Sequence, residues 1–235
     1  EFPGRTKAVA IEPMTGPEDA SGAVEARVLD GLRAALSGRV ASDELNRLVR
    51  VAGLDWRAVD VIRAYLEYAR QIGQAPAWTL GCDALARHPE ATRALAALFH
   101  ARFDPGLEAK REPALTGAAS ALAAARVPIR SAAEDRVFGV LESLIRATLR
   151  TSFFAAASPA DPHELALKLD SRAIAGIPAP VPVCEIFVHS SEFIGIHLRG
   201  GKVARGGLRW SDRLQDLRTE ILSLWKTQRV KNGLI

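Results

Sequence analysis

The segment 200–213 combines glycine pairs with basic side chains, a pattern typical of a loop that binds an anion. The residues that form the pattern are Gly200, Gly201, Lys202, Arg205, Gly206 and Gly207. Glycine has no Cβ, so backbone N–H groups in such a loop can approach an oxyanion closely. Judged by glycine and charge alone, an anion site and a plain tight turn are equally good interpretations.

Two nucleotide-binding motifs come close to this segment and do not fit it. A phosphate-binding P-loop ends in Gly-Lys followed by Ser or Thr. After the four-residue spacer between Gly201 and Gly206 the chain continues with Gly207 and Leu208, so the lysine and the metal-binding hydroxyl are both missing. The Gly-x-Gly-x-x-Gly pattern of dinucleotide-binding turns does not occur in the sequence.

The net charge of +4 is concentrated near the C-terminal end. Nine Lys and Arg residues and three Asp and Glu residues lie from Arg199 onward, while the rest of the chain carries a net charge of −2. This local excess favours one anion site over a generally basic surface. A nucleic-acid-binding module remains an alternative, although only Trp210 and Trp225 could stack on bases there.

The composition is that of a folded protein, with 48% hydrophobic and 25% charged residues among 235. No uncharged stretch reaches the roughly 20 helical residues that a membrane span needs, and the first residues do not resemble a secretory signal. We therefore expect a cytoplasmic protein. Cys82 and Cys184 are expected to be packed thiols, and the scattered histidines are expected to be structural, so no metal site is predicted.

The elements that must position the basic segment change character along the chain. Apolar residues recur at helical spacing up to about residue 160 and alternate beyond it, which indicates a domain boundary. We expect a segment of unassigned role with one helix at 1–41, a helical domain at 42–160 and the start of an α/β domain at 161–235. The predicted fold class is α+β or α/β, with a helical domain followed by a truncated α/β domain.

Within the helical domain, capping residues predict where helices begin. The expected starts are Ser42 or Asp43, Asp55, Pro89 and Ser131, and Glu134 is placed to complete a capping box with Ser131. One helical stripe is expected to be buried: Val59, Ile62, Leu66 and Ala69. The alanine-rich range 107–129 is interpreted as a loose connector with at most one short helix.

Beyond residue 161 the pattern predicts strands and then one helix. Alternating leucines at 165–169 predict a strand, and 183–189 and 193–199 predict two more that form a hairpin. Ser211 or Asp212 is expected to cap the following helix. The residues expected on its buried face are Leu214, Leu217, Ile221, Leu224 and Trp225.

The sequence resembles the large bacterial NAD-specific glutamate dehydrogenases. The motifs that carry the resemblance are Glu-Ile-Phe-Val at 185–188, the run 197–213 and Val-Lys-Asn at 230–232, with weaker matches upstream to about Ser42. The resemblance implies an NAD-dependent oxidoreductase that interconverts L-glutamate and 2-oxoglutarate plus ammonia. It also implies a homo-oligomer. No nucleic-acid or membrane partner is expected, because the basic excess is local and no apolar stretch is long enough to span a membrane.

The resemblance further implies which residues bind the substrate. Lys231 matches a lysine that binds the α-carboxylate of glutamate, and Gln228 matches a glutamine that orients the substrate. The run Arg205, Gly206, Gly207 stands where the smaller glutamate dehydrogenases have Lys-Gly-Gly, whose lysine pairs with the side-chain carboxylate. Arginine at this place is a departure, although it can bind a carboxylate through two parallel hydrogen bonds. A surface ion pair is the alternative role for Arg205.

Simple geometry is consistent with a shared site. An extended run from Arg205 to Trp210 advances about 16 Å, and a helix from Asp212 to Lys231 advances about 30 Å. Because the helix of an α/β unit packs back along its strand, Lys231 returns towards the level where the strand began. A dicarboxylate could then touch both cations.

The catalytic residues that the resemblance implies are not in this sequence. A polarising lysine, a proton-transferring aspartate and the NAD-binding domain are expected downstream of Ile235. We therefore interpret the chain as a fragment that contains part of the glutamate site and expect it to be inactive by itself. A regulatory or assembly role for the helical part is a further alternative.

Overall fold

A computed structural model describes residues 18–155, 164–201 and 211–233, with side chains from residue 22 to residue 227 within these ranges. The helical part comprises α1 (Glu18–Leu36), the short 3-10 helix η1 (Glu44–Arg47), α2 (Leu48–Val51), α3 (Trp56–Gln71), α4 (Trp78–Arg87), α5 (Pro89–Phe103), η2 (Pro105–Lys110), α6 (Arg111–Arg126) and α7 (Ala132–Ala147). The remainder comprises β1 (Thr148–Thr151), β2 (Leu165–Leu169), η3 (Ser171–Ala173), β3 (Cys184–His189), β4 (Ile194–Arg199) and α8 (Leu217–Gly233). The fold is mixed α+β.

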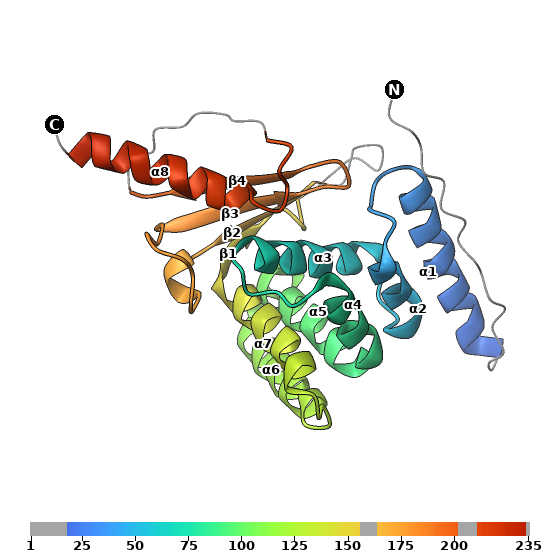
Figure 1. The fold of residues 1–235 in the computed structure, drawn as a ribbon. Helices are drawn as coiled ribbons and strands as arrows, with labels where there is room; N and C mark the ends of the chain where they lie inside the picture. Colours follow the sequence, from blue (N-terminus) through green and yellow to red (C-terminus); the bar gives the residue numbers. More distant parts are fainter. Residues whose placement is uncertain (1–17, 156–163, 202–210, 234–235) are drawn as a thin grey trace.

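Helix α3 lies at the centre of the molecule, between the sheet and the other helices (Figure 1). All four residues of its predicted stripe, from Val59 to Ala69, are buried. Tyr65 and Tyr68, which lie beside the stripe, are buried as well. The ring of Tyr68 lies 5.4 Å from the ring of Phe187 on β3, measured between centroids. One apolar core therefore joins the helices to the sheet.

The predicted helix starts agree with the structure at Asp43, Asp55 and Pro89. The carboxylate of Asp43 accepts a hydrogen bond from the backbone N–H two residues later at 2.9 Å. The carboxylate of Asp55 accepts one from the N–H three residues later at 2.8 Å. Pro89 is the first residue of α5. The two aspartates accept hydrogen bonds from N–H groups that a helix start leaves without an intrahelical acceptor.

The predicted capping box at the start of α7 is only half correct. The hydroxyl of Ser131 accepts a hydrogen bond from the N–H of Glu134 at 3.3 Å. The carboxylate of Glu134 binds Arg87 and His88 instead of reaching back to Ser131. The hydrogen bond from His88, together with the charge of Arg87, lowers the pKa of the Glu134 carboxyl. This contact joins the start of α7 to the end of α4.

Two helices differ from the prediction. The range 107–129 is not a loose connector, because α6 is a regular helix of 16 residues. Alanine has the highest helix propensity, and Pro113 lies in the first turn, where its missing N–H costs nothing. No helix is predicted at 78–87, where α4 forms. The start of α4 has no side-chain cap, so the local signal is absent.

The sheet has the order β1-β2-β3-β4, and all neighbouring strands are antiparallel. The three predicted strands are present as β2, β3 and β4. Strand β1 is not predicted, and it lies in the range 42–160 that is predicted to be helical. Residues of β2 and β3 alternate between the core and the opposite face, and the inward set is Leu165, Leu167, Leu169, Glu185, Phe187 and His189.

Both cysteines, Cys82 and Cys184, are free and buried, as predicted. Burial raises the pKa of the Cys82 thiol to about 12, with a smaller contribution from nearby carboxylates. In the part of the chain that the structure describes, no group of three His, Cys, Asp or Glu residues could hold a metal ion. Within the same ranges, no helix has the length and apolar character that crossing a membrane would require.

Candidate functional site

Helix α8 carries two of the predicted substrate residues, Gln228 and Lys231, and its buried face differs from the prediction. The helix begins at Leu217, later than the predicted caps at 211 or 212. Leu214 is therefore outside it and 54% exposed, and Leu224 is 39% exposed, so the prediction that both lie on the buried face is wrong. The buried residues are Leu217, Arg218 and Leu222. Of the other residues predicted on this face, Leu217 is buried and Ile221 and Trp225 are partly buried.

The first turn of α8 is held by a buried ion pair. Arg218 is 1% exposed, and Glu185 on β3 is fully buried. The guanidinium donates from Nε to Oε2 of Glu185 at 2.9 Å and from Nη2 to Oε1 at 2.6 Å. Two parallel hydrogen bonds of this kind fix orientation as well as distance. The pair therefore defines where the helix meets the sheet.

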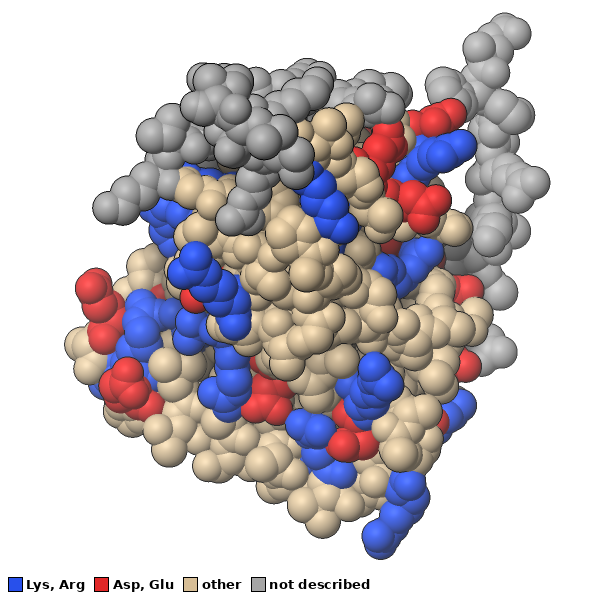
Figure 2. Space-filling view, turned by 60° about the vertical axis from the view of Figure 1, so that its left-hand side comes forward, with Lys and Arg blue, Asp and Glu red and all other residues tan. Residues whose placement is uncertain are grey.

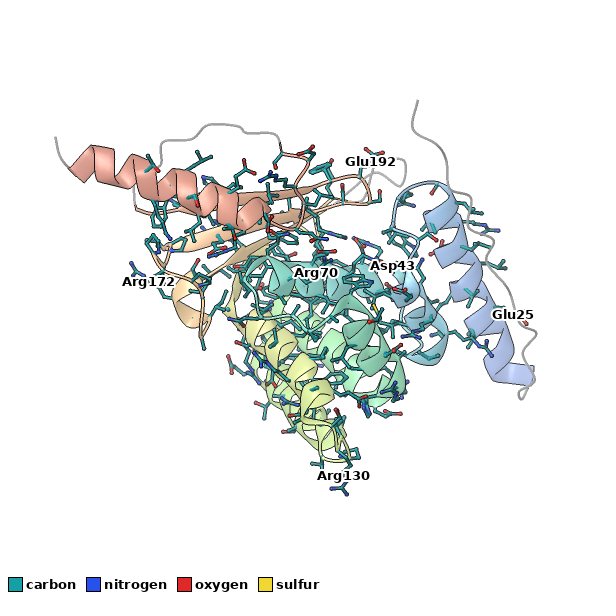
Figure 3. All side chains as sticks on the ribbon, viewed as in Figure 1. Glu25, Asp43, Arg70, Arg130, Arg172 and Glu192 are labelled. Atoms are coloured by element: carbon teal, nitrogen blue, oxygen red, sulfur yellow. The ribbon has the colours of Figure 1, made fainter. Side chains whose placement is uncertain are left out.

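Further donors complete the environment of the Glu185 carboxylate. Tyr68 of α3 donates from its hydroxyl to Oε2 at 3.0 Å. Ser171 of η3 donates to Oε1 at 3.3 Å. The position of η3 can be found in Figure 3 from the label of Arg172, the next residue. With the two bonds from Arg218, the carboxylate accepts four hydrogen bonds. A buried charge is tolerated when it is paired and hydrogen-bonded in this way.

Gln71, at the end of α3, binds the backbone at the start of α8. Its side-chain oxygen accepts a hydrogen bond from the N–H of Arg218 at 3.0 Å, and its side-chain nitrogen donates to the carbonyl of Leu214. The N–H groups of a helix's first turn lack intrahelical partners, so this amide acts as a cap supplied from another helix. Helix α3 therefore contacts α8 through Tyr68 by way of Glu185 and through Gln71 directly.

The protonation states of the cluster are set by burial and by the ion pair. Burial lowers the pKa of Arg218, but the hydrogen bond and the charge of Glu185 outweigh it and the net pKa is raised. Burial, reinforced by the adjacent Glu185 carboxylate, raises the pKa of the Tyr68 phenol. Arg218 therefore stays charged, and Tyr68 stays a hydrogen-bond donor, throughout the physiological pH range.

The start of the basic loop lies against α8. Gly200 follows β4, and a Cβ at this position would come within 2.4 Å of Cζ2 of Trp225. Such an approach is closer than any side chain tolerates, so glycine is required for the backbone and the indole to meet here. Gly200, which opens the predicted anion-binding segment, is therefore in contact with the middle of the helix that carries Lys231.

Gly200→Ala should weaken this contact. We expect a loss of about 1 to 3 kcal/mol in the free energy of unfolding, which is the usual cost of overpacking. Urea denaturation of the 235-residue chain, followed by tryptophan fluorescence, would measure it. Gly195→Ala on the same strand is the matched control, because its Cβ would lie 3.6 Å from Val188, an ordinary contact. Equal losses in both variants would show that Gly200 is not specially constrained.

The structure describes the backbone of two of the five predicted site residues. Gln228 and Lys231 lie on the helical backbone of α8, whose last residue is Gly233. Arg205, Gly206 and Gly207 lie outside the described residues. The structure thus shows a contact between the helix and Gly200, the first residue of the loop segment. The five substrate-site assignments stay predictions.

The ion pair and its partners were missed by sequence reasoning, although one signal was available. Glu185 lies two residues before Phe187 and four before His189, so on a strand its side chain points to the same inward face as theirs. A carboxylate at a core position needs a cation, and Arg218 on the next helix is a candidate. The residue that would pair with it depends on the fold, which local patterns do not give.

On the face of the molecule drawn in Figure 2, basic and acidic side chains are mixed. The face in Figure 2 shows Lys and Arg interspersed with Asp, Glu and uncharged residues. Several exposed cations have acidic partners, for example Arg47 with Asp83 at 2.6 Å. On that face the described residues do not form the continuous basic stripe that favours nucleic-acid binding.

Comparison with protein families gives two matches. Residues 122–235 match the family described as "Bacterial NAD-glutamate dehydrogenase, catalytic domain". Residues 40–105 match the family described as "Glutamate dehydrogenase, helical motif 3". The first range includes β1 to β4 and α8, and the second includes α2 to α5.

Three curated proteins, each named NAD-specific glutamate dehydrogenase, are similar to this chain. The protein of Halomonas elongata is 44% identical over 200 residues, which is 85% of this chain and 12% of that protein. That of Mycobacterium tuberculosis is 44% identical over 214 residues, 89% of this chain and 13% of that protein. That of Pseudomonas aeruginosa is 42% identical over 213 residues, 85% of this chain and 13% of that protein.

Proposed function

We propose that this chain forms part of an enzyme that oxidises L-glutamate to 2-oxoglutarate and ammonia with NAD. The proposal follows because the chain belongs to the family of large bacterial NAD-specific glutamate dehydrogenases. The chain spans about 12 to 13% of the length of the relatives it matches, so the activity proposed is that of a longer protein. The proposal includes a cytoplasmic homo-oligomer, as the family resemblance implies.

Within that enzyme we assign this chain the task of holding the substrate. Lys231 would bind the α-carboxylate of glutamate, Gln228 would orient the substrate, and Arg205 would pair with the side-chain carboxylate. Backbone N–H groups of Gly206 and Gly207 would approach the same anion. A dicarboxylate needs a cation for each carboxylate, and in this proposal Arg205 supplies one and Lys231 of α8 supplies the other.

One observation carries this assignment: Gly200, the first residue of the loop segment, is packed against Trp225 of α8. Gln228 follows Trp225 by three residues on the helix, and Lys231 follows Gln228 by three more. Residues three apart are neighbours on a helix surface. Gly200, which opens the predicted anion-binding segment, therefore contacts the part of the helix that leads to Gln228 and Lys231.

We assign NAD binding and the catalytic step to residues outside this chain. The sequence has no Gly-x-Gly-x-x-Gly turn, and the polarising lysine of the family is not among its matched motifs. NAD, when bound, accepts the hydride, and the protein binds and orients the substrate. What this chain contributes is therefore substrate affinity and orientation.

The assignment predicts the kinetics of Lys231→Ala in the full-length enzyme. The glutamate KM should rise about 10- to 150-fold, because a charge-assisted bond contributes roughly 1.5 to 3 kcal/mol, while the KM for NAD should change little. Steady-state kinetics with each substrate varied in turn would measure both. Lys226→Ala is the control, since that side chain is exposed on the same helix. An equal rise in both KM values would indicate that Lys231 supports the fold instead.

A further inference from the structure

We propose that Glu185 and Arg218 are positioning residues that set the direction of α8 and, through it, the place of Lys231 in the substrate site. This inference rests on the proposed function, since it acts through the residue assigned to the α-carboxylate. The observation behind it is the buried two-bond contact between a strand of the sheet and the first turn of that helix.

The buried side chains of α8, among those that the structure describes, lie near its start. Leu217, Arg218 and Leu222 are the buried residues of the helix among those that the structure describes with side chains. Further along, Ser223, Leu224, Lys226 and Thr227 are exposed. Figure 1 shows the C-terminal part of the helix extending away from the helical half of the molecule. Apart from the contact of Trp225 with Gly200, the described contacts that set the direction of α8 are therefore those of its first turns.

A small change of direction at Arg218 becomes large at Lys231. The two residues are thirteen positions apart, which is about 20 Å along a helix. Over that length a tilt of about 10° displaces the backbone at the far end by about 3 Å, and a misplacement of about 1 Å can already cost a factor of about 100 in rate. The apolar contact of Trp225 with Gly200 limits such a tilt but does not define an angle, since apolar packing is not directional.

The chemistry of the pair fits orientation better than stabilisation. A buried ion pair can often be replaced by apolar residues of similar volume without loss of stability, because charge desolvation offsets the attraction. The fork of a guanidinium on a carboxylate, by contrast, fixes one relative orientation of the two groups. Here Tyr68 and Ser171 also hold the carboxylate, so the acceptor itself cannot turn.

The decisive variant is the apolar double substitution Glu185→Met with Arg218→Met in the full-length enzyme. We expect thermal stability near that of the wild type but kcat/KM for glutamate about 10- to 100-fold lower, with the KM for NAD unchanged. Arg218→Lys keeps the charge and loses the fork, so it should fall between the wild type and the double variant. Recovery of both stability and glutamate kinetics in the double variant would overturn the positioning role.

Adding Lys231→Ala to each background separates this inference from the proposed function. If the pair acts through Lys231, the lysine substitution should cost much less in the double-variant background than in the wild type. Full additivity of the two losses would contradict the positioning inference and leave the substrate assignment intact. A Lys231→Ala enzyme with unchanged glutamate kinetics would instead refute the substrate assignment, and the positioning inference with it.

Discussion

Replacing Arg63 with alanine should lower the free energy of unfolding by about 3 to 5 kcal/mol, a large fraction of the stability of a typical domain. Arg63 is 2% exposed at the middle of α3. Its guanidinium donates to Asp43 at 2.8 Å, to Asp60 at 2.6 Å and to the side-chain oxygen of Asn46 at 2.7 Å. Asp43, labelled in Figure 3, lies where the chain passes from α1 towards α3.

The size of the effect follows from what the substitution leaves behind. Asp60 is itself 2% exposed, so removing Arg63 deprives a buried carboxylate of its guanidinium. Breaking a buried pair from one side is costly, because the remaining charge keeps its desolvation penalty. Burial lowers the pKa of Arg63, yet the hydrogen bonds and charges of Asp43 and Asp60 outweigh burial and raise it. The site is therefore built for a cation.

Thermal and urea denaturation of the 235-residue chain would measure this loss, with an expected fall in Tm of about 6 to 20 °C. The matched control is Arg47→Ala. Arg47 and its partner Asp83 are 40% and 48% exposed, so that variant should lose no more than about 1 kcal/mol. A loss for Arg63→Ala as small as that of the control would show that the carboxylates find other partners or take up protons.

The parts of the fold that could be predicted are those in which the signal is local. Asp55 caps α3 and Ser131 caps α7 because a side chain reaches an N–H only three residues away. The alternation of Leu165 to Leu169 marks a strand because every second residue faces the core. In these cases the residues that make the interaction are neighbours in the sequence.

The parts that could not be predicted depend on residues brought together by folding. Strand β1 has only four residues, and it is defined by its pairing with β2 rather than by a pattern of its own. Glu134 has the spacing of a local cap, but it binds Arg87 and His88, which are 47 and 46 residues away. The same holds for Glu185 and Arg218, which are 33 residues apart. Only the tertiary structure determines which of several possible partners is close.

The candidate site divides in the same way. Lys231 and Gln228 are identified by a motif that resembles a known family, and the structure adds the helix that carries them. The contact of Gly200 with Trp225 could not be predicted, because two glycines in succession are equally compatible with a plain turn. The sequence predicts the cationic groups, and the structure adds the contact between Gly200 and the helix that carries Lys231.

Arg205→Ala in the full-length enzyme should produce the largest functional effect. If Arg205 pairs with the side-chain carboxylate, its removal leaves that charge without a partner in the site. We expect a loss of about 2 to 4 kcal/mol of transition-state stabilisation, which lowers kcat/KM for glutamate about 30- to 1,000-fold. Arg205→Lys keeps the positive charge without the two-bond geometry, so it should retain part of the activity. The exposed Arg213 provides a control position in the variant Arg213→Ala.

The measurement that most directly tests the substrate assignment compares glutamate with norvaline, which has the same α-amino acid group and no side-chain carboxylate. In the full-length enzyme, Arg205→Ala should lower kcat/KM for glutamate and leave that for norvaline nearly unchanged, whereas Lys231→Ala should lower both. Of the two variants, only Arg205→Ala would then lose the preference for glutamate over norvaline. If Arg205→Ala lowers kcat/KM equally for both substrates, or for neither, the claim that this chain holds the two carboxylates of glutamate is wrong.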